Sequence, residues 1–401
     1  MTEFHRLTLG DILTFQRGFD ITKNEQSEGA VPIVSSSGIS SYHNKWKVRG
    51  PGLVIGRKGT LGTVHYIRPD FWPHDTTLWV KDFKGNSPIF LSYFLRTLKL
   101  DNFDVGASNP TVNRNHLHKI RVIFPRTTAL QSRIAAVLSA YDDLIDINKR
   151  RIELLEQVAE EIYREWFVRL RFPGHERTGI TKGVPDGWDV IPFSQLVMVN
   201  PPERVDRREE LPFVGMEDLS VNTMFFTPTE VRKGGQGAKF RNRDVLFPRI
   251  TPSVENGKRG FVMTLEDGQV GFGSTEFIVL REKTLGPEHI YFLTCSADFR
   301  KHAELSMTGA SGRQRVQEEC FSFFLVKTPP PEIREQFREI VRPHFLQIHL
   351  LSRQIDCLTR ARDLLLPWLI SGRLSVENLD IQLPPAMSAE FNAKPAIAAH
   401  A

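Results

Sequence analysis

Apolar residues recur at a seven-residue spacing over two long stretches of this chain. Residues 129–168 contain neither Gly nor Pro. Two apolar seams run along them: Leu138, Ile145, Ile152, Ala159 and Trp166 form one, and Ile134, Tyr141, Asn148, Leu155 and Ile162 form the other. A sustained heptad is typical of a helix that packs along another helix. A helix of about 40 residues would be roughly 60 Å long.

The same spacing returns near the C-terminus. Its seams are Val341, Ile348, Ile355 and Leu369, and Phe337, Leu351, Leu358 and Leu365. His344 and Arg362 interrupt these seams, and Pro343 should kink the helix or break its first turns because proline has no amide proton. Gly372 is a suitable stop. We expect the two helices to pair with one another; two ordinary bundle helices are the alternative.

The chain contains an internal repeat. Gly106-Ala107-Ser108 recurs 203 residues later as Gly309-Ala310-Ser311, and the same shift carries apolar residues of the first helix onto apolar residues of the second. Upstream, residues 31–34 match 211–214 and residues 53–55 match 245–247, at shifts of 180 and 192. Insertions in surface loops explain the changing shift. The sequence therefore predicts two copies of one unit.

Short apolar runs between Gly- and Pro-rich turns precede each long helix, and they predict short strands. In the first copy they are residues 53–56, 63–67 and 78–80, and in the second 245–247, 260–263 and 277–280. A short helix is expected at 88–98 and at 287–299. The predicted fold class is α+β, with two similar mixed domains, each followed by a long α-helix.

These patterns divide the chain into six segments. The mixed domains are residues 1–124 and 188–328, the helical spacers are 125–170 and 329–375, and 171–187 form a turn-rich linker. Residues 376–401, rich in Ala and Pro, are expected to be a disordered tail.

Composition excludes several classes of protein. The three cysteines show no CxxC spacing, so neither a disulfide framework nor a zinc site is indicated. No stretch of 18 apolar residues could span a membrane, and the first residues lack the pattern of a signal peptide. We therefore expect a cytoplasmic protein.

Basic residues gather in the loops of the mixed domains, where backbone can approach a phosphate closely. Residues 1–124 carry 16 Lys and Arg against 10 Asp and Glu, and a second basic stretch spans 232–259. Arg, Asn and Gln side chains are those that read guanine and adenine edges. A solvated basic surface is the alternative for any single residue. The candidate DNA-binding residues are Arg57, Lys58, Thr60, Asn109, Asn113, Arg114, Lys239, Arg241, Arg243, Arg249, Lys258, Arg259, Arg313, Gln314 and Arg315.

Residues for catalysis or metal binding do not form a recognisable site. Asn200-Pro201-Pro202-Glu203 resembles a motif of DNA amino-methyltransferases, but Glu203 replaces the aromatic that would stack on a flipped base, so we interpret it as a turn. Residues 255–259 lack the glycine and hydroxyl of a phosphate loop. His116 and His118 alternate as strand residues would and have no companion ligands. We predict no catalytic residue and no metal site.

The order of motifs resembles the specificity subunit of type I restriction–modification systems. The likeness covers about residues 1–375. It rests on Gly106, Pro110, Leu117, residues 120–125 and Gln131; on Gly309, residues 323–326 and 329–331; and on residues 166–168, 362–367 and 371–374.

The resemblance implies two target-recognition domains, each reading half of a split site in double-stranded DNA, and helices that pair as an antiparallel coiled coil. It also implies two methyltransferase subunits and restriction/translocase subunits as partners, which would hold S-adenosylmethionine, ATP and Mg. The apolar residues Trp166-Phe167 and 364–370 would suit such partners. The alternatives are a coiled-coil scaffold whose basic loops are only solvated, and a degenerate DNA methyltransferase.

Overall fold

The computed structural model describes residues 4–103, 111–125, 127–205, 208–228, 230–310 and 312–382. The chain forms two compact units, Met1–Ile145 with Cys357–Ala401, and Asp146–Asp356. Each long helix therefore contributes residues to both units.

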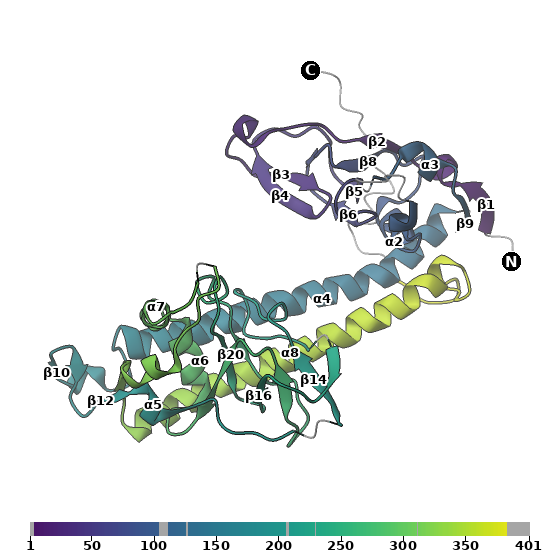
Figure 1. Cartoon of the computed structure of the whole chain (residues 1–401). Coiled ribbons are helices and arrows are strands. Elements are labelled where there is room, and N and C mark those ends of the chain that lie inside the picture. The colour runs from purple at the N-terminus through teal and green to yellow at the C-terminus, as the bar shows by residue number, and fades with distance from the viewer. Residues whose placement is uncertain are drawn as a thin grey trace. The chain divides into compact units, whose positions relative to one another are not determined.

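The first unit is built on three small sheets (Figure 1). A four-stranded sheet has the order β2 (Thr14–Arg17), β8 (Thr77–Asp82), β5 (Gly52–Gly56) and β6 (Val64–Ile67). A three-stranded sheet has the order β4 (Gly38–His43), β3 (Val31–Ser35) and β7 (Trp72–Pro73). Strands β1 (Phe4–Thr8) and β9 (Arg121–Pro125) pair antiparallel.

Short helices complete the first unit and cover its core. They are α1 (Leu9–Ile12), α2 (Pro88–Arg96) and α3 (Arg114–His118), with 3-10 turns η1 (Lys23–Glu25) and η2 (Leu100–Phe103). Phe90 and Phe94 of α2 pack edge-on against Phe124. Ile134 and Leu138 of the first long helix belong to the same buried cluster, which mounts the sheets on that helix.

The second unit repeats this plan with a longer set of strands. One sheet has the order β13 (Val197–Val199), β20 (Phe277–Glu282), β17 (Val245–Pro248) and β18 (Gly260–Phe261). Another has the order β15 (Glu230–Lys233), β14 (Glu210–Val214), β19 (Gly271–Gly273) and β16 (Ala238–Phe240). The pairs are β12 (Asp189–Pro192) with β21 (Leu325–Thr328), and β10 (Ile180–Thr181) with β11 (Val184–Pro185). The short helices are α5 (Phe193–Leu196), α6 (Pro287–Cys295), α7 (Ala297–Leu305), η4 (His175–Arg177) and η5 (Glu318–Ser322).

Strand pairing confirms the sequence repeat. The order β2-β8-β5-β6 corresponds to β13-β20-β17-β18, strand for strand and with the same antiparallel directions. Strands β3 and β14 each pair antiparallel on one side and parallel on the other. Part of the extra length in the second copy lies between β14 and β15. There Met224 and Thr223 both donate to the carboxylate of Glu156, which fixes this insertion to the first long helix.

The first long helix, α4, spans Thr128–Tyr163 and continues as one π-helical turn, η3, over Arg164–Val168. Every residue of its first predicted seam is buried, namely Leu138, Ile145, Ile152, Ala159 and Trp166. Of the second seam, Ile134 and Asn148 are buried, while Tyr141, Leu155 and Ile162 are half-buried. The pattern therefore identified the packed face of this helix.

The second long helix, α8, spans Pro331–Ile370. Of the two effects expected of Pro343, a kink or a break, the break was wrong, because the helix passes through this residue. The lost amide proton is tolerated at a position where Pro343 itself is exposed. In this helix Phe337, Val341, Ile348, Leu351 and Leu369 are buried, and Ile355, Leu358 and Leu365 are half-buried.

Two short elements differ from the prediction. The expected helix over 287–299 is divided into α6 and α7, because Ser296 takes an extended conformation and its hydroxyl caps α7 by accepting from the Phe299 amide. His116 and His118 lie in the helix α3, and not in a strand. Asn113 caps that helix and Leu117 is buried beneath it, which accounts for the helical turn.

The segment after α8 corrects the predicted tail boundary. Gly372 ends the helix with a φ of +72°, and its backbone lies so close to the ring of Phe4 that a side chain would collide with it. Val376 is buried, and the guanidinium of Arg133 donates to the carbonyls of Val376, Glu377 and Leu379. Residues 376–382 therefore pack on the first unit. Among the described residues, no helix is long and apolar enough to cross a membrane.

Candidate nucleic-acid interface

A backbone corner in the first unit joins two of the segments predicted to contact DNA. Arg57 follows strand β5, and its amide donates to the carbonyl of Thr76 at 2.9 Å. The carbonyl of Arg57 accepts from the amide of Val112 at 3.0 Å, and Lys58 forms a bridge with Thr111. The loop 57–60 and the segment 111–114 are thus held side by side.

The second unit builds the same corner after strand β17. The amide of Arg249 donates to the carbonyl of Glu276 at 2.9 Å, and the Arg249 carbonyl accepts from Val316 at 2.7 Å. Ile250 bridges Arg315, and Thr251 donates to Gln314. Candidate residues of the two copies therefore occupy equivalent positions at the ends of equivalent strands.

The corner in the first unit carries unpaired positive charge. The side chains of Lys58 and Arg114 are exposed and form no ion pair among the described residues. Gly59 has a φ of +76°, and a Cβ added to it would meet no atom within 4 Å, so a phosphate can approach the backbone there. Thr60 is exposed on the same loop, whereas the side chain of Asn113 is already used to cap α3.

Arg57 shares its surroundings with a second arginine that sequence reasoning missed. Arg17, at the end of β2, forms an ion pair with Asp75 at 2.9 Å, and Arg57 donates weakly to the Asp75 carbonyl at 3.4 Å. Burial, and then the charge of Arg17, lowers the pKa of the Arg57 guanidinium. A lone Arg at a strand end gives no sequence signal, because its neighbour Asp75 lies 58 residues away.

The second unit is different, because most of its predicted cations, at the corner and elsewhere, already have partners. The carboxylate partners are Glu203 for Arg241, Glu282 for Arg243, Glu318 for Arg249 and Glu276 for Arg315. Lys258 donates to the Met216 carbonyl and Lys239 to that of Gly237. A cation that is paired with a carboxylate attracts phosphate less strongly. Any binding of DNA by this unit would therefore depend more on the positions of its donors than on its net charge.

Three further candidates differ in accessibility. Arg259 points inward, where it donates to the hydroxyl of Tyr291 at 3.2 Å and to the carbonyl of Gly257 at 2.8 Å, so its guanidinium is engaged in the fold. Arg313 is exposed without an ion pair among the described residues, and Gln314 is half-buried. Asn109 lies outside the described residues.

The segment that resembles a methyltransferase motif is a bend at Asn200 followed by irregular backbone, where a turn was predicted. Asn200 has a φ of +47°, and its side chain accepts from the amide of Val279 at 2.8 Å. The carboxylate of Glu203 is covered by Arg241 and Arg281. Both polar side chains of this motif are therefore engaged within the fold.

Comparison with known proteins agrees with these features. A family model described as the type I restriction modification DNA specificity domain matches residues 1–157. The chain is 25% identical over 309 residues to the type I restriction enzyme MjaIX specificity subunit of Methanocaldococcus jannaschii, covering 72% of this chain and 70% of that protein. It is 31% identical over 154 residues to the type I restriction enzyme EcoEI specificity subunit of Escherichia coli, covering 37% and 26%.

A solved structure shares the fold. The S subunit of a type I restriction–modification system from M. genitalium matches with a TM-score of 0.60 at 14% identity, over 92% of this chain and 96% of that one. Together, the family model over residues 1–157 and the curated relatives support recognition of DNA sequence by this chain. The relatives that it matches are specificity subunits of type I restriction enzymes.

Proposed function

We propose that this specificity subunit reads a bipartite site in duplex DNA and directs methyltransferase and restriction subunits to it. The domain at residues 1–124 would read one half and the domain at 188–328 the other. The observation that carries the proposal is the duplicated corner, in which Arg57 and Arg249 occupy the same place after β5 and β17. Because the side chains around the two corners differ, the two half-sites would differ in sequence.

The helices α4 and α8 would pair as an antiparallel coiled coil and set the distance between the half-sites. Polar contacts at two of their seam positions support this arrangement. In the second unit Asn148 contacts Gln354 at 3.4 Å, and in the first unit Arg362 contacts Asp142 at 2.5 Å. Polar residues at seam positions fix the register of paired helices at some cost in stability.

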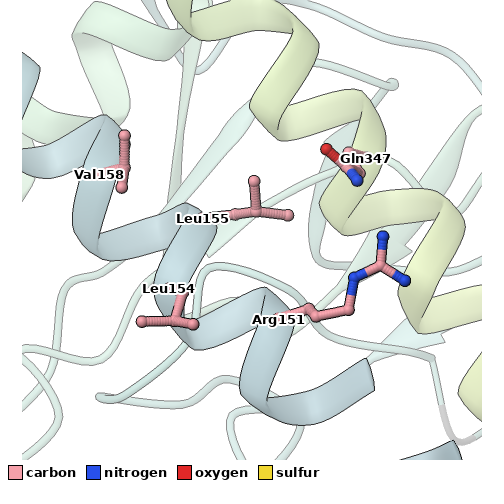
Figure 2. A pocket seen from close by; sticks show the side chains of 5 residues that line it. All are labelled: Arg151, Leu154, Leu155, Val158 and Gln347. Atoms are coloured by element: carbon pink, nitrogen blue, oxygen red, sulfur yellow. The ribbon is translucent and has the colours of Figure 1, made fainter. Parts of the chain in front are cut away.

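Exposed apolar side chains on the helices support the docking of partner subunits. Ile147, Leu154 and Val158 are about half exposed on α4, and Leu364 and Trp368 are exposed on α8. Figure 2 shows Leu154, Leu155 and Val158 beside Arg151, with Gln347 on the facing helix. The sequence suggested Trp166-Phe167 for this role, but Trp166 is buried and Phe167 packs on Phe337, so this part of the expectation was wrong.

The partners would be two methyltransferase subunits per chain and the restriction/translocase subunits, acting in the cytoplasm. S-adenosylmethionine, ATP and Mg would be bound by those subunits. The residues described here offer the DNA-reading surfaces and the helical frame. Site selection from a randomised duplex pool, using the chain together with its methyltransferase partners, tests the proposal. Enrichment of two short motifs at a fixed spacing is the expected result, and a single continuous motif or no enrichment would contradict it.

A further inference from the structure

The backbone of Arg315 is held rigidly on both sides. Its amide donates to the carbonyl of Thr308 at 2.9 Å, and its carbonyl accepts from the amide of Thr308 at 3.1 Å. The side-chain amide of Gln317 donates to the same carbonyl and to the Thr308 hydroxyl. A bridge to Ile250 joins this residue to the corner after β17. The Cα of Arg315 is therefore fixed within the candidate interface.

The side chain of Arg315 is also fixed. Its Nη2 donates to Oε1 of Glu276 at 2.6 Å and its Nε to Oε2 at 2.9 Å. The carboxylate is largely covered, with 21% of its side chain exposed, whereas 47% of the Arg315 side chain is exposed. Surface ion pairs contribute little to stability, so such a rigid exposed pair suggests a binding role.

This geometry leaves one edge of the guanidinium available. An arginine has five N–H donors, and the contact with Glu276 uses Nε and one side of Nη2. Nη1 and the remaining proton of Nη2 form a second pair of parallel donors. Two parallel donors match the two acceptors, O6 and N7, that guanine presents in the major groove of DNA.

We infer that Arg315 reads a guanine in one half-site and that Glu276 is its positioning residue. The inference rests on the proposed function and assigns base recognition to one residue of the second corner. The corresponding position in the first unit is Thr111, which has no guanidinium, so the same contact could not be made in the other half-site.

The ion pair also accounts for selectivity. Because Glu276 neutralises Arg315, a contact with an arbitrary phosphate adds little binding free energy. The full binding free energy is obtained only where two acceptors of a base face the two free N–H donors of Arg315. The neighbouring Arg313 is exposed and has no carboxylate partner among the described residues, so it suits a phosphate. The two arginines therefore divide base reading from backbone attraction.

The test compares site selection by the full chain and by three variants, each with its methyltransferase partners. Arg315→Lys keeps the charge but removes the two parallel N–H donors. Preference for guanine at one position should therefore fall roughly 5- to 150-fold, while the other half-site is unchanged. Glu276→Gln should weaken the same preference, raise binding to arbitrary duplex DNA and steepen its salt dependence. The matched control, Arg313→Lys, should leave every base preference intact.

The outcomes separate the two levels of the argument. A wild-type split motif that Arg315→Lys leaves unchanged, or a lost preference for a base other than guanine, overturns the inference and leaves the proposed function standing. A wild-type chain that selects no split motif overturns both. If Glu276→Gln lowers specific and arbitrary binding together, its role is structural and the positioning role is rejected; thermal unfolding of each variant identifies a general loss of folding.

Discussion

Arg362 of α8 donates to Asp142 of α4 within the first unit, with Nη1 2.5 Å from Oδ1. The other oxygen of the same carboxylate accepts from the hydroxyl of Tyr93, on α2, also at 2.5 Å. Burial, and then the hydrogen bond to Asp142, raises the pKa of Tyr93, so the hydroxyl remains the donor. One carboxylate thus joins two long helices to the domain mounted on them, and the interrupted seam at Arg362 has a partner.

Removing this carboxylate should destabilise the first unit. Asp142→Ala leaves the partly covered Arg362 and the Tyr93 hydroxyl without their acceptor, which should cost about 1–3 kcal/mol of unfolding free energy. Asp142→Asn keeps one acceptor for Tyr93 and should cost less. Urea unfolding of the full chain measures both variants. An alanine variant as stable as the wild type would show that the contact contributes nothing.

A charge in the buried seam of the second unit should be more damaging. Ile152 is buried in the cluster that contains Phe345, Ile348 and Leu351 of α8. Ile152→Asp would bury an unpaired carboxylate and should destabilise the chain by several kcal/mol, on the order of 3–5. The control is Leu154→Asp, because Leu154 is exposed on the same helix. Equal melting temperatures for the two variants would contradict the assignment of the packed face.

Lys58 should contribute to DNA affinity without contributing to sequence choice. Its exposed side chain has no ion pair among the described residues and lies beside the open backbone of Gly59. Lys58→Ala should reduce the slope of log affinity against log salt by about 1 and leave the selected motif unchanged. Lys81→Ala, on the exposed far end of β8, is the matched control and should not alter the slope. A changed motif would instead make Lys58 a base reader.

Acid should weaken the second unit through His289. This imidazole is buried against Phe167, Tyr163 and Phe337, and burial, then the charge of Arg334, lowers its pKa to about 3. Above pH about 6.5 the ring is neutral in both folded and unfolded chains, so a change of pH in this range does not alter stability through His289. As pH falls below that value only the unfolded chain takes up the proton, and stability should drop by up to about 1.4 kcal/mol per pH unit.

The matched variant for this prediction is His289→Phe, which keeps an aromatic ring and removes the titrating group. Urea unfolding between pH 7 and pH 5 should show a shallower loss of stability for the variant than for the wild type. The carboxylates contribute equally to both chains, so the difference reports on His289. Parallel curves would mean that His289 is not the titrating group.

The spacer between half-sites should follow helix length, if the proposed pairing of α4 and α8 is correct. We would insert seven residues after Ile145 and seven after Asp356, where the chain passes from one compact unit to the other. Because seven residues are one heptad, both apolar patterns would be preserved. Each insertion adds about 10.5 Å of helix, or roughly three base pairs of DNA. The selected motif should keep both halves and gain a longer spacer. An unchanged spacer would contradict the proposal that the length of the helices sets the distance between the half-sites.

The long helices and the repeat could be predicted from sequence because each is indicated by many residues at regular spacing. The eight apolar seam positions of α8 outweigh the single Pro343, which was expected to kink or break the helix and does not interrupt it. By contrast, His116 and His118 offer only two positions, and alternation over so short a stretch suits a strand as well as a helix. The cap at Asn113 and the burial of Leu117 decide between them, and both depend on the folded environment.

The candidate interface was predictable in its location and less so in its electrostatics. Arg57 and Arg249 were matched by the repeat, and the structure gives them equivalent backbone hydrogen bonds. The pairing of Arg249 with Glu318 and of Arg315 with Glu276 could not be read from sequence, since the partners lie 69 and 39 residues away. A free and a paired arginine look identical until the strands bring their neighbours together.

The contact between Phe4 and Gly372 gives the chain the connectivity of a nearly closed ring. The first described strand meets the end of the last helix, and Arg133 holds the residues that follow, so both ends belong to one unit. In such a ring the place where the polypeptide is opened has little influence on packing. A circularly permuted chain, with its old ends joined and new ends cut in the exposed turn around Gly183, would preserve every strand pair of both mixed domains.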